Sequence, residues 1–482
     1  MSDSADTWTR LNALRDGGHV PHPARSRRTH TVLEVLKGLA EPAVDDAVGP
    51  ACGLPVGHSH PQLIVAGRLY GTPAAPQLVD ATGRLSLPGV TSLPTDLQPG
   101  DWVEVALTLD GGDLQVVATH LLAPALAPPL PAPPEADRPF DSICPGGGAS
   151  ISTLRRRAQL LHGLRIFFQG RGFLEVETPA LTTRPGLEPH LDPFETRYRA
   201  YPQAQGRPAW LLTSPEYAMK RLLVAGVERC FQVSRVFRNG ECGPMHNPEF
   251  TMVEWYRTHA SYLDIMVDCE DLILSLAANL GLGLGLSWQG QAIDLSPPWE
   301  RLTVEDALRR YAGVEMNDIL DLEGVHRAAQ ALGLHLPEDC PWDDAFFHIL
   351  MEKVEPRLGF TKPTFLMDYP APLAALAKLK GDDARVAERF ELYVAGQELG
   401  NAFSELSCPQ EQSQRFESER EHRAAIGSPI FEVDPDYLLA LRQGLPPTGG
   451  IAVGVDRLAM ILLDIPDVRR VLAFPFDGAM PE

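Results

Sequence analysis

Several side chains able to bind a nucleotide gather in one segment with two strand-like halves, RVFRNGECGPMHNPEFTMVEWYR, which begins at Arg235. A guanidinium carries a fork of N–H donors that suits phosphate oxygens, so we expect Arg238, together with His246, to bind a nucleotide's phosphates. The ring of Phe250 is placed to stack on the base. An ion-paired hairpin without any ligand is the alternative interpretation of the same residues.

A second segment, RFELYVAGQELGNAFSEL, predicts a hairpin with a two-residue turn at Ala395-Gly396. That turn pairs Tyr393 with Glu398 and Glu391 with Gly400. Since side chains alternate along a strand, the carboxylates of Glu391 and Glu398 converge on one face. Two close carboxylates need a cation between them, and Mg²⁺ carrying the phosphates of ATP fits. The alternative is a solvated hairpin face.

Farther along the same segment Asn401, Phe403 and Glu405 alternate, so an amide, a ring and a carboxylate share one face. Their parity is opposite to that of Glu398. Both groups can face a single pocket only if a bulge or a break interrupts the strand.

A third segment, PPTGGIAVGVDRLAMILLD, is a glycine-rich strand that leads through Asp456 and Arg457 into an apolar helical run. Glycine allows a ligand to approach the backbone closely, and an arginine at the end of a strand can reach a phosphate. This pattern alone is weak, because neither a dinucleotide fingerprint nor a Walker lysine follows it.

The elements that must position these side chains are a mixture of helices and strands without regular βαβ repetition. Apolar residues from Leu154 to Phe168 recur at helical spacing, and the pattern ends at Gly170 and Gly172. Strand-like runs follow, such as LEVETPAL, RCFQVSRVFRN, PEFTMVEWYR, RFELYVAG and IAVGV. We therefore expect an α+β domain with helices flanking an antiparallel sheet.

The chain is predicted to divide at a proline-rich spacer, because residues 122–139 carry seven prolines. Short alternating runs before the spacer predict a small β-barrel, and barrels of the OB type are common at this size. The predicted organisation is a helical leader over 1–60, an OB-like barrel over 61–121, a linker over 122–149 and the main domain over 150–482.

Composition limits the possible partners and location. The formal charge of −21 disfavours nonspecific binding to a polyphosphate. The seven cysteines are scattered and form no C-x-x-C pair, so we expect reduced thiols. No apolar run is long enough to cross a bilayer and no signal peptide opens the sequence, which predicts a cytoplasmic protein without membrane contact.

The three segments, in this order and spacing, resemble motifs 2 and 3 of the class II aminoacyl-tRNA synthetases, and LEVETPAL resembles the motif 1 strand with its proline, Pro179. Other runs, including LTSPEYAMKRLLVAG, HNPEFTMVEWY and KPTFLMDYP, resemble the lysine branch of that family. The resemblance covers most of residues 150–476. It implies the antiparallel sheet of the class II catalytic domain and a ligase that activates lysine with ATP.

The resemblance also implies roles for individual residues. Arg238 and Arg457 would hold the α- and γ-phosphates of a bent ATP and act in catalysis, and Glu391 and Glu398 would bind Mg²⁺. The further ATP-binding residues would be Asn239, Gly240, Glu241, His246, Asn247, Phe250, Glu398, Leu399 and Gly454. The lysine pocket would comprise Ser214, Pro215, Glu216, Glu254, Tyr256, Asn401, Phe403, Glu405 and Ala452.

One position departs from the family pattern. The family has a glutamate two residues after the motif 2 arginine, where it contacts adenine, whereas this chain has Gly240 followed by Glu241. Glu241 can substitute if the loop shifts by one residue. Without that shift adenine recognition is weakened, which leaves a noncatalytic paralogue as one alternative.

The resemblance leaves two acceptors for the activated amino acid. Lysyl-tRNA synthetases charge tRNA(Lys), whereas related ligases attach lysine or (R)-β-lysine to a lysine side chain of elongation factor P. The predicted barrel favours the former. Its acidic balance, with two basic against eight acidic residues from Pro61 to Asp137, disfavours RNA and leaves only Tyr70 and Trp102 to stack on bases.

In the main domain Ala452 stands where the synthetases tend to have glycine, and SPEYAMKRLLVAG and TMVEWYR are closer to the elongation factor P ligases. PPTGG and FSEL are closer to the synthetases. Our expectation is therefore a ligase of the elongation factor P type that keeps a degenerate barrel, with tRNA charging as the alternative. The resemblance further implies a homodimer, because motif 1 forms the subunit interface in this family.

Overall fold

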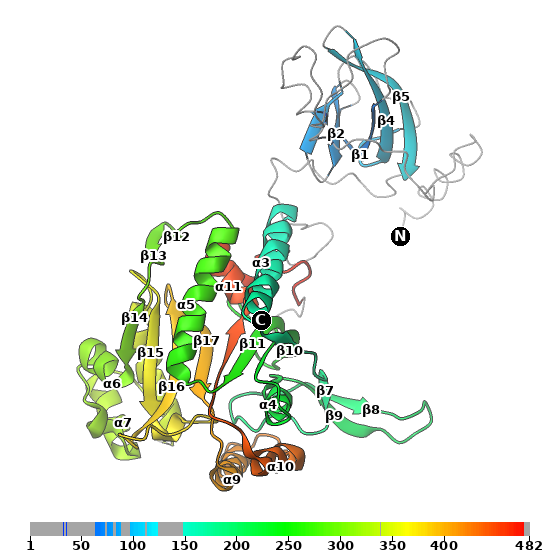
Figure 1. Ribbon diagram of the computed structural model, residues 1–482. Coiled ribbons are helices and arrows are strands. Elements are labelled where there is room, and N and C mark those ends of the chain that lie inside the picture. The colour runs from blue at the N-terminus through cyan, green and yellow to red at the C-terminus, as the bar shows by residue number, and fades with distance from the viewer. Residues whose placement is uncertain are drawn as a thin grey trace. The chain divides into compact units, whose positions relative to one another are not determined.

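The computed structural model describes two compact units, residues 1–138 and 139–482 (Figure 1). The described residues are 32, 35, 63–72, 75–80, 83–87, 97–110, 113–123, 148–337 and 339–476.

The N-terminal unit is a five-stranded antiparallel sheet in the order β3-β2-β1-β4-β5, consistent with the predicted OB fold. No pairing between β3 and β5 closes it into a barrel among the described residues. Val32 and Val35, the described part of the predicted leader, are helical and buried in its core. The strands are β1 (Leu63–Thr72), β2 (Ala75–Asp80), β3 (Gly83–Ser86), β4 (Trp102–Asp110) and β5 (Asp113–Ala123).

The structure corrects two expectations about the surface of this unit, one on the stacking residues and one on the acidic residues. Tyr70 is buried and unable to stack on a base, whereas Trp102 is 41% exposed with the Arg68 guanidinium 5.5 Å from its ring centre. Asp101 and Glu104 are also buried, so they add nothing to the acidic surface. The strand β5 runs to Ala123, two residues into the predicted linker, of which residues 124–147 lie outside the described part.

The C-terminal unit is built on an eight-stranded sheet in the order β14-β15-β16-β17-β18-β11-β10-β6. The inner pairs are antiparallel, as predicted, and the pairs at the two edges, β14–β15 and β10–β6, are parallel. The run LEVETPAL contributes to this sheet only the two-residue edge strand β6. The strands are β6 (Leu174–Glu175), β10 (Arg229–Phe237), β11 (Glu249–Thr258), β14 (Glu300–Thr303), β15 (Thr364–Pro370), β16 (Val386–Val394), β17 (Gln397–Ser404) and β18 (Thr448–Gly454).

Two small sheets complete the strands of this unit: β7 (Leu181–Thr182), β8 (Glu195–Tyr198) and β9 (Arg207–Leu211) form one, and β12 (Gly285–Trp288) and β13 (Gln291–Asp294) form the other.

The helix predicted from the apolar spacing is α3 (Ile151–Gly170), which Ser150 caps by accepting a hydrogen bond from the backbone of Thr153 at 3.1 Å. The other α-helices are α4 (Glu216–Val224), α5 (Tyr262–Asn279), α6 (Val304–Ala307), α7 (Leu322–Ala331), α8 (Trp342–Ile349), α9 (Pro409–Ala425), α10 (Pro435–Gly444) and α11 (Val455–Leu463). Short 3₁₀ or π turns are η1 (Leu308–Ala312), η2 (Met316–Ile319), η3 (Leu350–Val354), η4 (Glu355–Arg357), η5 (Ala371–Leu373) and η6 (Val468–Val471).

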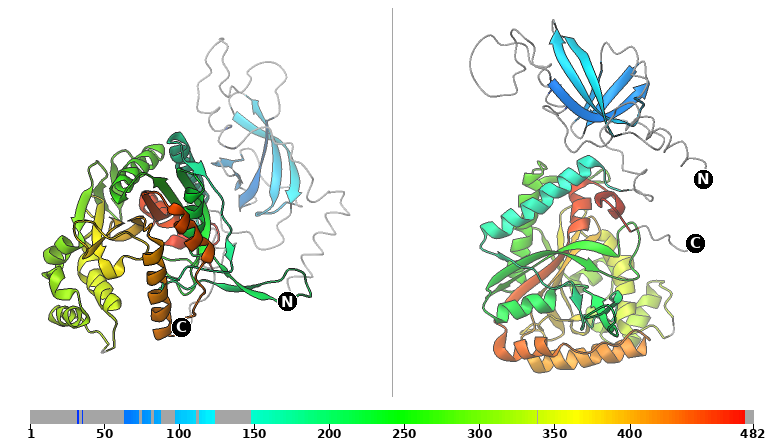
Figure 2. Two further views of the ribbon diagram at one scale, coloured as in Figure 1. Left: turned by 60° about the horizontal axis from the view of Figure 1, so that its bottom comes forward. Right: turned by 90° about the vertical axis from the view of Figure 1, so that its right-hand side faces the viewer.

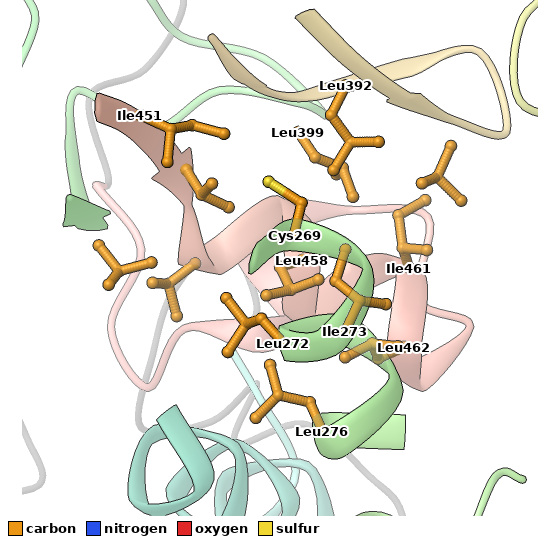
Figure 3. Packing of buried hydrophobic residues seen from close by; sticks show 14 of the residues in the cluster. Cys269, Leu272, Ile273, Leu276, Leu392, Leu399, Ile451, Leu458, Ile461 and Leu462 are labelled. Carbon is orange, nitrogen blue, oxygen red and sulfur yellow. The ribbon is translucent and has the colours of Figure 1, made fainter. Parts of the chain in front are cut away.

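Helices α3, α5 and α11 lie together beside the sheet, and α9 and α10 lie at the opposite end of the unit (Figures 1 and 2). The main core forms where α5 and α11 pack on the sheet, with Leu272, Ile461, Leu392 and Ile451 among its buried members (Figure 3). Each such side chain contributes roughly 1.5–3 kcal/mol by leaving water. This apolar layer fixes one face of β16, β17 and β18 and leaves their other face for the site.

The β16–β17 hairpin has the predicted two-residue turn, in which Ala395 and Gly396 have φ of 55° and 72°. Tyr393 pairs with Glu398 as expected, but Glu391 pairs with Asn401 instead of Gly400. The error in register has a simple cause, since a bulge at Leu399 inserts one residue into β17. The bulge is the interruption that the opposite parities of Glu398 and Asn401 required.

No helix among the described residues has the length and apolar character needed to span a bilayer.

Candidate active site

A cavity of about 700 Å³ opens beside the free face of β11, β16, β17 and β18. Predicted site residues from all three sequence segments border this cavity together. They are Arg238, Glu241, His246, Asn247 and Phe250 from the first segment, Glu398, Leu399, Asn401 and Phe403 from the second, and Ala452, Gly454 and Arg457 from the third, joined by Ser214 and Glu216.

Arg457 is fixed by main-chain and side-chain acceptors at the base of this cavity. Its Nη1 donates to the carbonyl oxygen of Glu398 at 2.9 Å and lies 3.5 Å from the Glu398 carboxylate, and its Nη2 donates to Nε2 of His246. Burial and the neighbouring Arg457 lower the pKa of His246, so the ring is neutral and can accept this bond. The arginine is thus held in place with part of its fork of donors available for a phosphate.

Arg238 lies across the cavity with its guanidinium 5.2 Å from the centre of the Phe250 ring. Its Nη1 is 3.8 Å from the carboxylate of Glu241, and its buried Nε has no partner within the described residues. An unsatisfied buried guanidinium N–H favours an anionic ligand at this position.

The loop after Arg238 places Glu241 on the cavity wall, whereas Asn239 and Gly240 do not border it. Gly240 has φ of +83°, a left-handed conformation that favours glycine over a side chain. The geometry agrees with the one-residue shift considered for Glu241. The backbone N–H of Asn239 donates to the carbonyl of Asp192 at 2.7 Å.

Two other residues of the predicted nucleotide set have side chains that are already occupied. Asn247 donates from Nδ2 to the carbonyl of Glu249 at 2.6 Å and accepts at Oδ1 from the backbone N–H of Phe476 at 3.0 Å. Leu399 borders the cavity, yet its side chain packs in the apolar core near Leu392 (Figure 3). Both residues therefore shape the wall more than they offer polar groups to a base.

The two carboxylates predicted to bind metal are close enough to repel each other. Burial and then the charge of Glu391 raise the pKa of Glu398. A third carboxyl, Glu355, joins them: burial and Glu391 raise its pKa to about 7, and the hydroxyl of Tyr393 donates to it at 3.2 Å. The sequence reasoning missed Glu355 because it lies in η4, outside every motif.

Glu391 does not border the cavity and is nearly saturated with donors. Its Oε1 accepts from Arg389 at 2.6 Å, and its Oε2 accepts from the hydroxyls of Tyr369 at 2.6 Å and Tyr393 at 2.8 Å. A carboxylate offers about four lone pairs, so one remains for a metal. An oxygen-only set with surplus negative charge fits a hard cation such as Mg²⁺, and Glu398 is the one of the three carboxyls that borders the cavity.

The predicted lysine pocket has a carboxylate, Glu254, held by two hydroxyl groups. Ser214 Oγ donates to its Oε1 at 2.7 Å, and the hydroxyl of Tyr256 donates to its Oε2 at 2.9 Å. Burial, followed by repulsion from Glu216, raises the pKa of Glu254 to about 8. The carboxyl of Glu254 is therefore mostly protonated in the free protein at neutral pH, and a bound cation would favour loss of that proton.

A second part of the same pocket contains Glu216, Glu405 and a lysine that the motif analysis did not single out, Lys220. The Nζ of Lys220 donates to Glu216 Oε1 at 2.5 Å and forms an ion pair with Glu405 Oε2. Burial raises the pKa of Glu405 to about 8, although Lys220 opposes the shift. The signal was in the sequence, because Lys220 follows Glu216 by four residues on one helix.

Some predicted pocket residues lie behind the cavity wall. Ser214, Glu216, Asn401, Phe403 and Ala452 border the cavity. Pro215, Glu254, Tyr256 and Glu405 do not, and the last three form a buried layer that a long side chain would have to reach. We call Glu216, Glu254, Tyr256 and Glu405 the acidic cradle.

The outer part of the cavity is formed by residues that sequence reasoning did not find. Helix α9 contributes Glu411, Arg415, Glu419 and His422, whose spacing of three to four places them on one helical face. Beside His422, His190 Nε2 lies 3.1 Å from Asp343, and together with Asp344 these groups are close enough to hold a metal ion.

Comparisons with known proteins agree with this geometry. Residues 149–478 match the family model for tRNA synthetases class II (D, K and N). The chain is 36% identical to a lysine–tRNA ligase of Synechococcus sp. (strain RCC307), over 98% of this chain and 96% of that protein. A lysine–tRNA ligase of Roseiflexus castenholzii (strain DSM 13941 / HLO8) is 34% identical, over 97% of this chain and 96% of that protein. The chain therefore belongs to the class II tRNA synthetases of the D, K and N group, which are ATP-dependent ligases.

Proposed function

We propose that this protein is a lysine–tRNA ligase, which activates lysine with ATP and transfers it to tRNA(Lys). The acidic cradle carries the proposal. Two buried carboxylates, Glu254 and Glu405, and the phenol of Tyr256 lie behind the wall of a cavity that Glu216, Arg238 and Arg457 border. A substrate with two ammonium groups needs such acceptors to replace the water it loses, and a neutral amino acid would leave them unpaired.

The chemistry needs no side-chain nucleophile. An oxygen of the lysine carboxylate attacks the α-phosphorus of ATP and forms a new C–O–P linkage. The bond from the α-phosphorus to the oxygen that bridges to the β-phosphate breaks, and pyrophosphate leaves with that oxygen. Arg238 and Arg457 are positioned to neutralise the charge that develops on the phosphates. Mg²⁺, when bound at Glu398, Glu391 and Glu355, would offset further phosphate charge. In the second step a hydroxyl of the tRNA terminus attacks the carbonyl of the adenylate and AMP leaves.

The choice of tRNA as acceptor rests on likeness along the whole chain. The two lysine–tRNA ligases named above match 98% and 97% of this protein, so the likeness includes the N-terminal unit. The electrostatic objection to RNA is also weaker than the sequence suggested, since Asp101 and Glu104 are buried and Trp102 remains exposed. These observations reverse the order of acceptors expected from the sequence.

Elongation factor P, with lysine or (R)-β-lysine as the activated substrate, is the second candidate. One observation favours it: Ala452 borders the cavity and pairs with Asn401 of the predicted lysine pocket. A methyl group at that position narrows the space beside the substrate's amino groups and would favour a different placement of one of them.

One experiment separates these candidates. The purified protein is supplied with ATP, Mg²⁺ and labelled lysine or (R)-β-lysine, and the label is then counted on tRNA(Lys) and on elongation factor P separately. We expect transfer of lysine to tRNA. Label on elongation factor P alone would refute the proposal in favour of the second candidate, and the absence of pyrophosphate exchange with either substrate would point to the noncatalytic paralogue.

We also propose that the protein acts as a homodimer through α3 and β6. Ile166 on α3 and Leu174 on β6 are 56% and 55% exposed in the single chain, which is unfavourable for large apolar side chains unless a partner covers them. Sedimentation equilibrium is expected to give twice the chain mass, and replacement of both residues by aspartate is expected to give monomers. A wild-type monomer at micromolar concentration would contradict this.

A further inference from the structure

Lys220 is a buried cation in the wall of the acidic cradle. Its side chain is 1% exposed, and it reaches from α4 to Glu216 on its own helix and to Glu405 at the end of β17. A lysine is almost never so deeply buried unless carboxylates compensate its charge. Burial lowers the pKa of Lys220, whereas Glu216 and Glu405 raise it. The resulting pKa lies well above the usual value for lysine, so the ammonium stays charged.

The partners of Lys220 are only partly satisfied by it. Glu405 Oε2 pairs with the ammonium, whereas Glu405 Oε1 is buried without a hydrogen-bond partner among the described residues, as is Oδ1 of Asn401. An unpaired buried acceptor costs on the order of 1–3 kcal/mol. Two such acceptors in one predicted pocket indicate that a donor from outside the chain belongs there.

The charges of the cradle fit this assignment. Glu216, Glu254 and Glu405 could carry three negative charges, and Lys220 reduces them to a net two, which is the number of ammonium groups on free lysine. Without the internal cation, one more proton would have to occupy the cradle at neutral pH.

We propose that Lys220 is a positioning residue for the substrate's side-chain amine: its ammonium fixes Glu405 Oε2 and Glu216, leaving Glu405 Oε1 and Asn401 Oδ1 to receive the substrate. The inference rests on the proposed activation of lysine and holds for either acceptor. It makes Lys220 an internal counter-charge that keeps the cradle ionised enough to bind a diamine.

The charge of Lys220, and not only its shape, should matter because ionisable groups surround it on every side. They are Glu216 on α4, Glu254 on β11, Glu405 after β17 and Tyr437 on α10. Removal of the only cation in this group would shift their ionisation to higher pH.

The test compares Lys220→Met, which keeps length and loses charge, with Lys220→Arg, which keeps charge and changes shape. Lys380→Met is the matched control, since Lys380 pairs with Asp368 at 2.7 Å away from the cradle. Lysine-dependent pyrophosphate exchange is measured from about pH 6 to 9 to give KM for lysine and for ATP, and thermal melting reports folding.

For Lys220→Met we expect KM for lysine to rise at least about tenfold at neutral pH, and its pH profile to move up by about one unit. KM for ATP stays at the wild-type value. Lys220→Arg and the control keep the wild-type pH profile. If Lys220→Met does not fold, Lys220→Gln replaces it as the neutral variant.

A loss of lysine affinity with an unchanged pH profile, or an equal loss in Lys220→Arg, would assign Lys220 a merely structural role and overturn the inference. So would a neutral variant that behaves like the wild type. A protein that exchanges pyrophosphate normally but does not charge tRNA would refute only the proposed acceptor. A wild type with no lysine-dependent exchange would overturn both proposals.

Discussion

Lysine is expected to bind more tightly as the pH rises toward 8, because the carboxyls that receive its ammonium groups must first lose their protons. Burial raises the pKa of both Glu254 and Glu405 to about 8. A protonated carboxyl presents a neutral group to the substrate, and binding therefore has to release the proton. The perturbation is the pH of the assay, with the protein and both substrates unchanged.

The magnitude follows from the titration of a single group. At pH 7 a carboxyl with a pKa of about 8 is ionised in about one molecule in ten, and at pH 8 in about one in two. If one of the two carboxyls must ionise for binding, kcat/KM for lysine rises about fivefold from pH 7 to pH 8 and approaches tenfold per pH unit below pH 7. If both must ionise, the rise approaches a hundredfold per unit. In either case the curve flattens above about pH 8.

Two measurements check this prediction. Lysine-dependent pyrophosphate exchange gives kcat/KM across the pH range, with ATP saturating. Titration calorimetry in two buffers of different ionisation enthalpy counts the protons that lysine binding releases, and we expect one to two at pH 7. A flat pH profile together with no proton release would refute the assignment of these carboxyls as the substrate's partners.

The same shifts affect the stability of the free protein. The native pKa of Glu254 lies near 8 while its ordinary value is 4.5. A carboxyl with a raised native pKa contributes stability that is fully present below pH 4.5 and is lost as the pH rises through about 8. For this shift the loss is about 5 kcal/mol when the lone group ionises. Thermal melting should therefore show a stabilisation by lysine that grows with pH.

Three further perturbations have defined outcomes. Arg157→Met removes the 2.5 Å ion pair with buried Asp456, the residue before Arg457, so urea denaturation should show a loss of about 3–5 kcal/mol in the free energy of unfolding. Arg327→Ala, which breaks an exposed ion pair, should change that free energy by less than about 1 kcal/mol. Gly450→Ala places a Cβ 2.2 Å from one cradle side chain and 2.5 Å from another, so KM for lysine should rise at least about tenfold, while Gly170→Ala, which meets open space, should leave it unchanged. Chelation of divalent metal should abolish pyrophosphate exchange and added Mg²⁺ should restore it; exchange that survives chelation would contradict the carboxylate site.

Local patterns in the sequence predicted the elements well. The apolar spacing from Leu154 to Phe168 identified α3, and the Ala395-Gly396 dipeptide identified the hairpin turn. These predictions succeed because helical period and turn conformation depend on neighbouring residues alone. The predicted pairing of Glu391 with Gly400 was wrong, because the bulge at Leu399 adds one residue to β17 and shifts the register. The opposite parities of Glu398 and Asn401 required an interruption in the strand but did not give its position.

The residues of the candidate site could be predicted where they belong to sequence motifs, and not where only the folded structure brings them together. Arg238, Glu398 and Arg457 come from three segments and border one cavity, as expected. Glu355 lies outside every motif, and Lys220 lies in a run quoted only for its resemblance; the sequence does not show that both are buried beside other carboxyls. Burial depends on long-range packing, which one sequence without a structure does not reveal.

The bulge at Leu399 explains how one hairpin can serve both ends of the cavity. In an unbroken strand Glu398 and Asn401 would point to opposite faces, and either the proposed metal ligand Glu398 or the proposed lysine-pocket residue Asn401 would face the apolar core. Because of the inserted residue, the side chains of Glu398, Asn401 and Phe403 lie on the same face of the strand and border the cavity. The side chain of Leu399 packs in the apolar core (Figure 3). In the proposed reaction the carboxylate of lysine lies between the proposed amine-binding residues and the nucleotide phosphates, and the bulge lets residues proposed for both roles face one cavity from a single strand. Deletion of Leu399 should therefore separate the two functions, and a deletion variant that retained both ATP and lysine binding would show that the bulge is not what joins them.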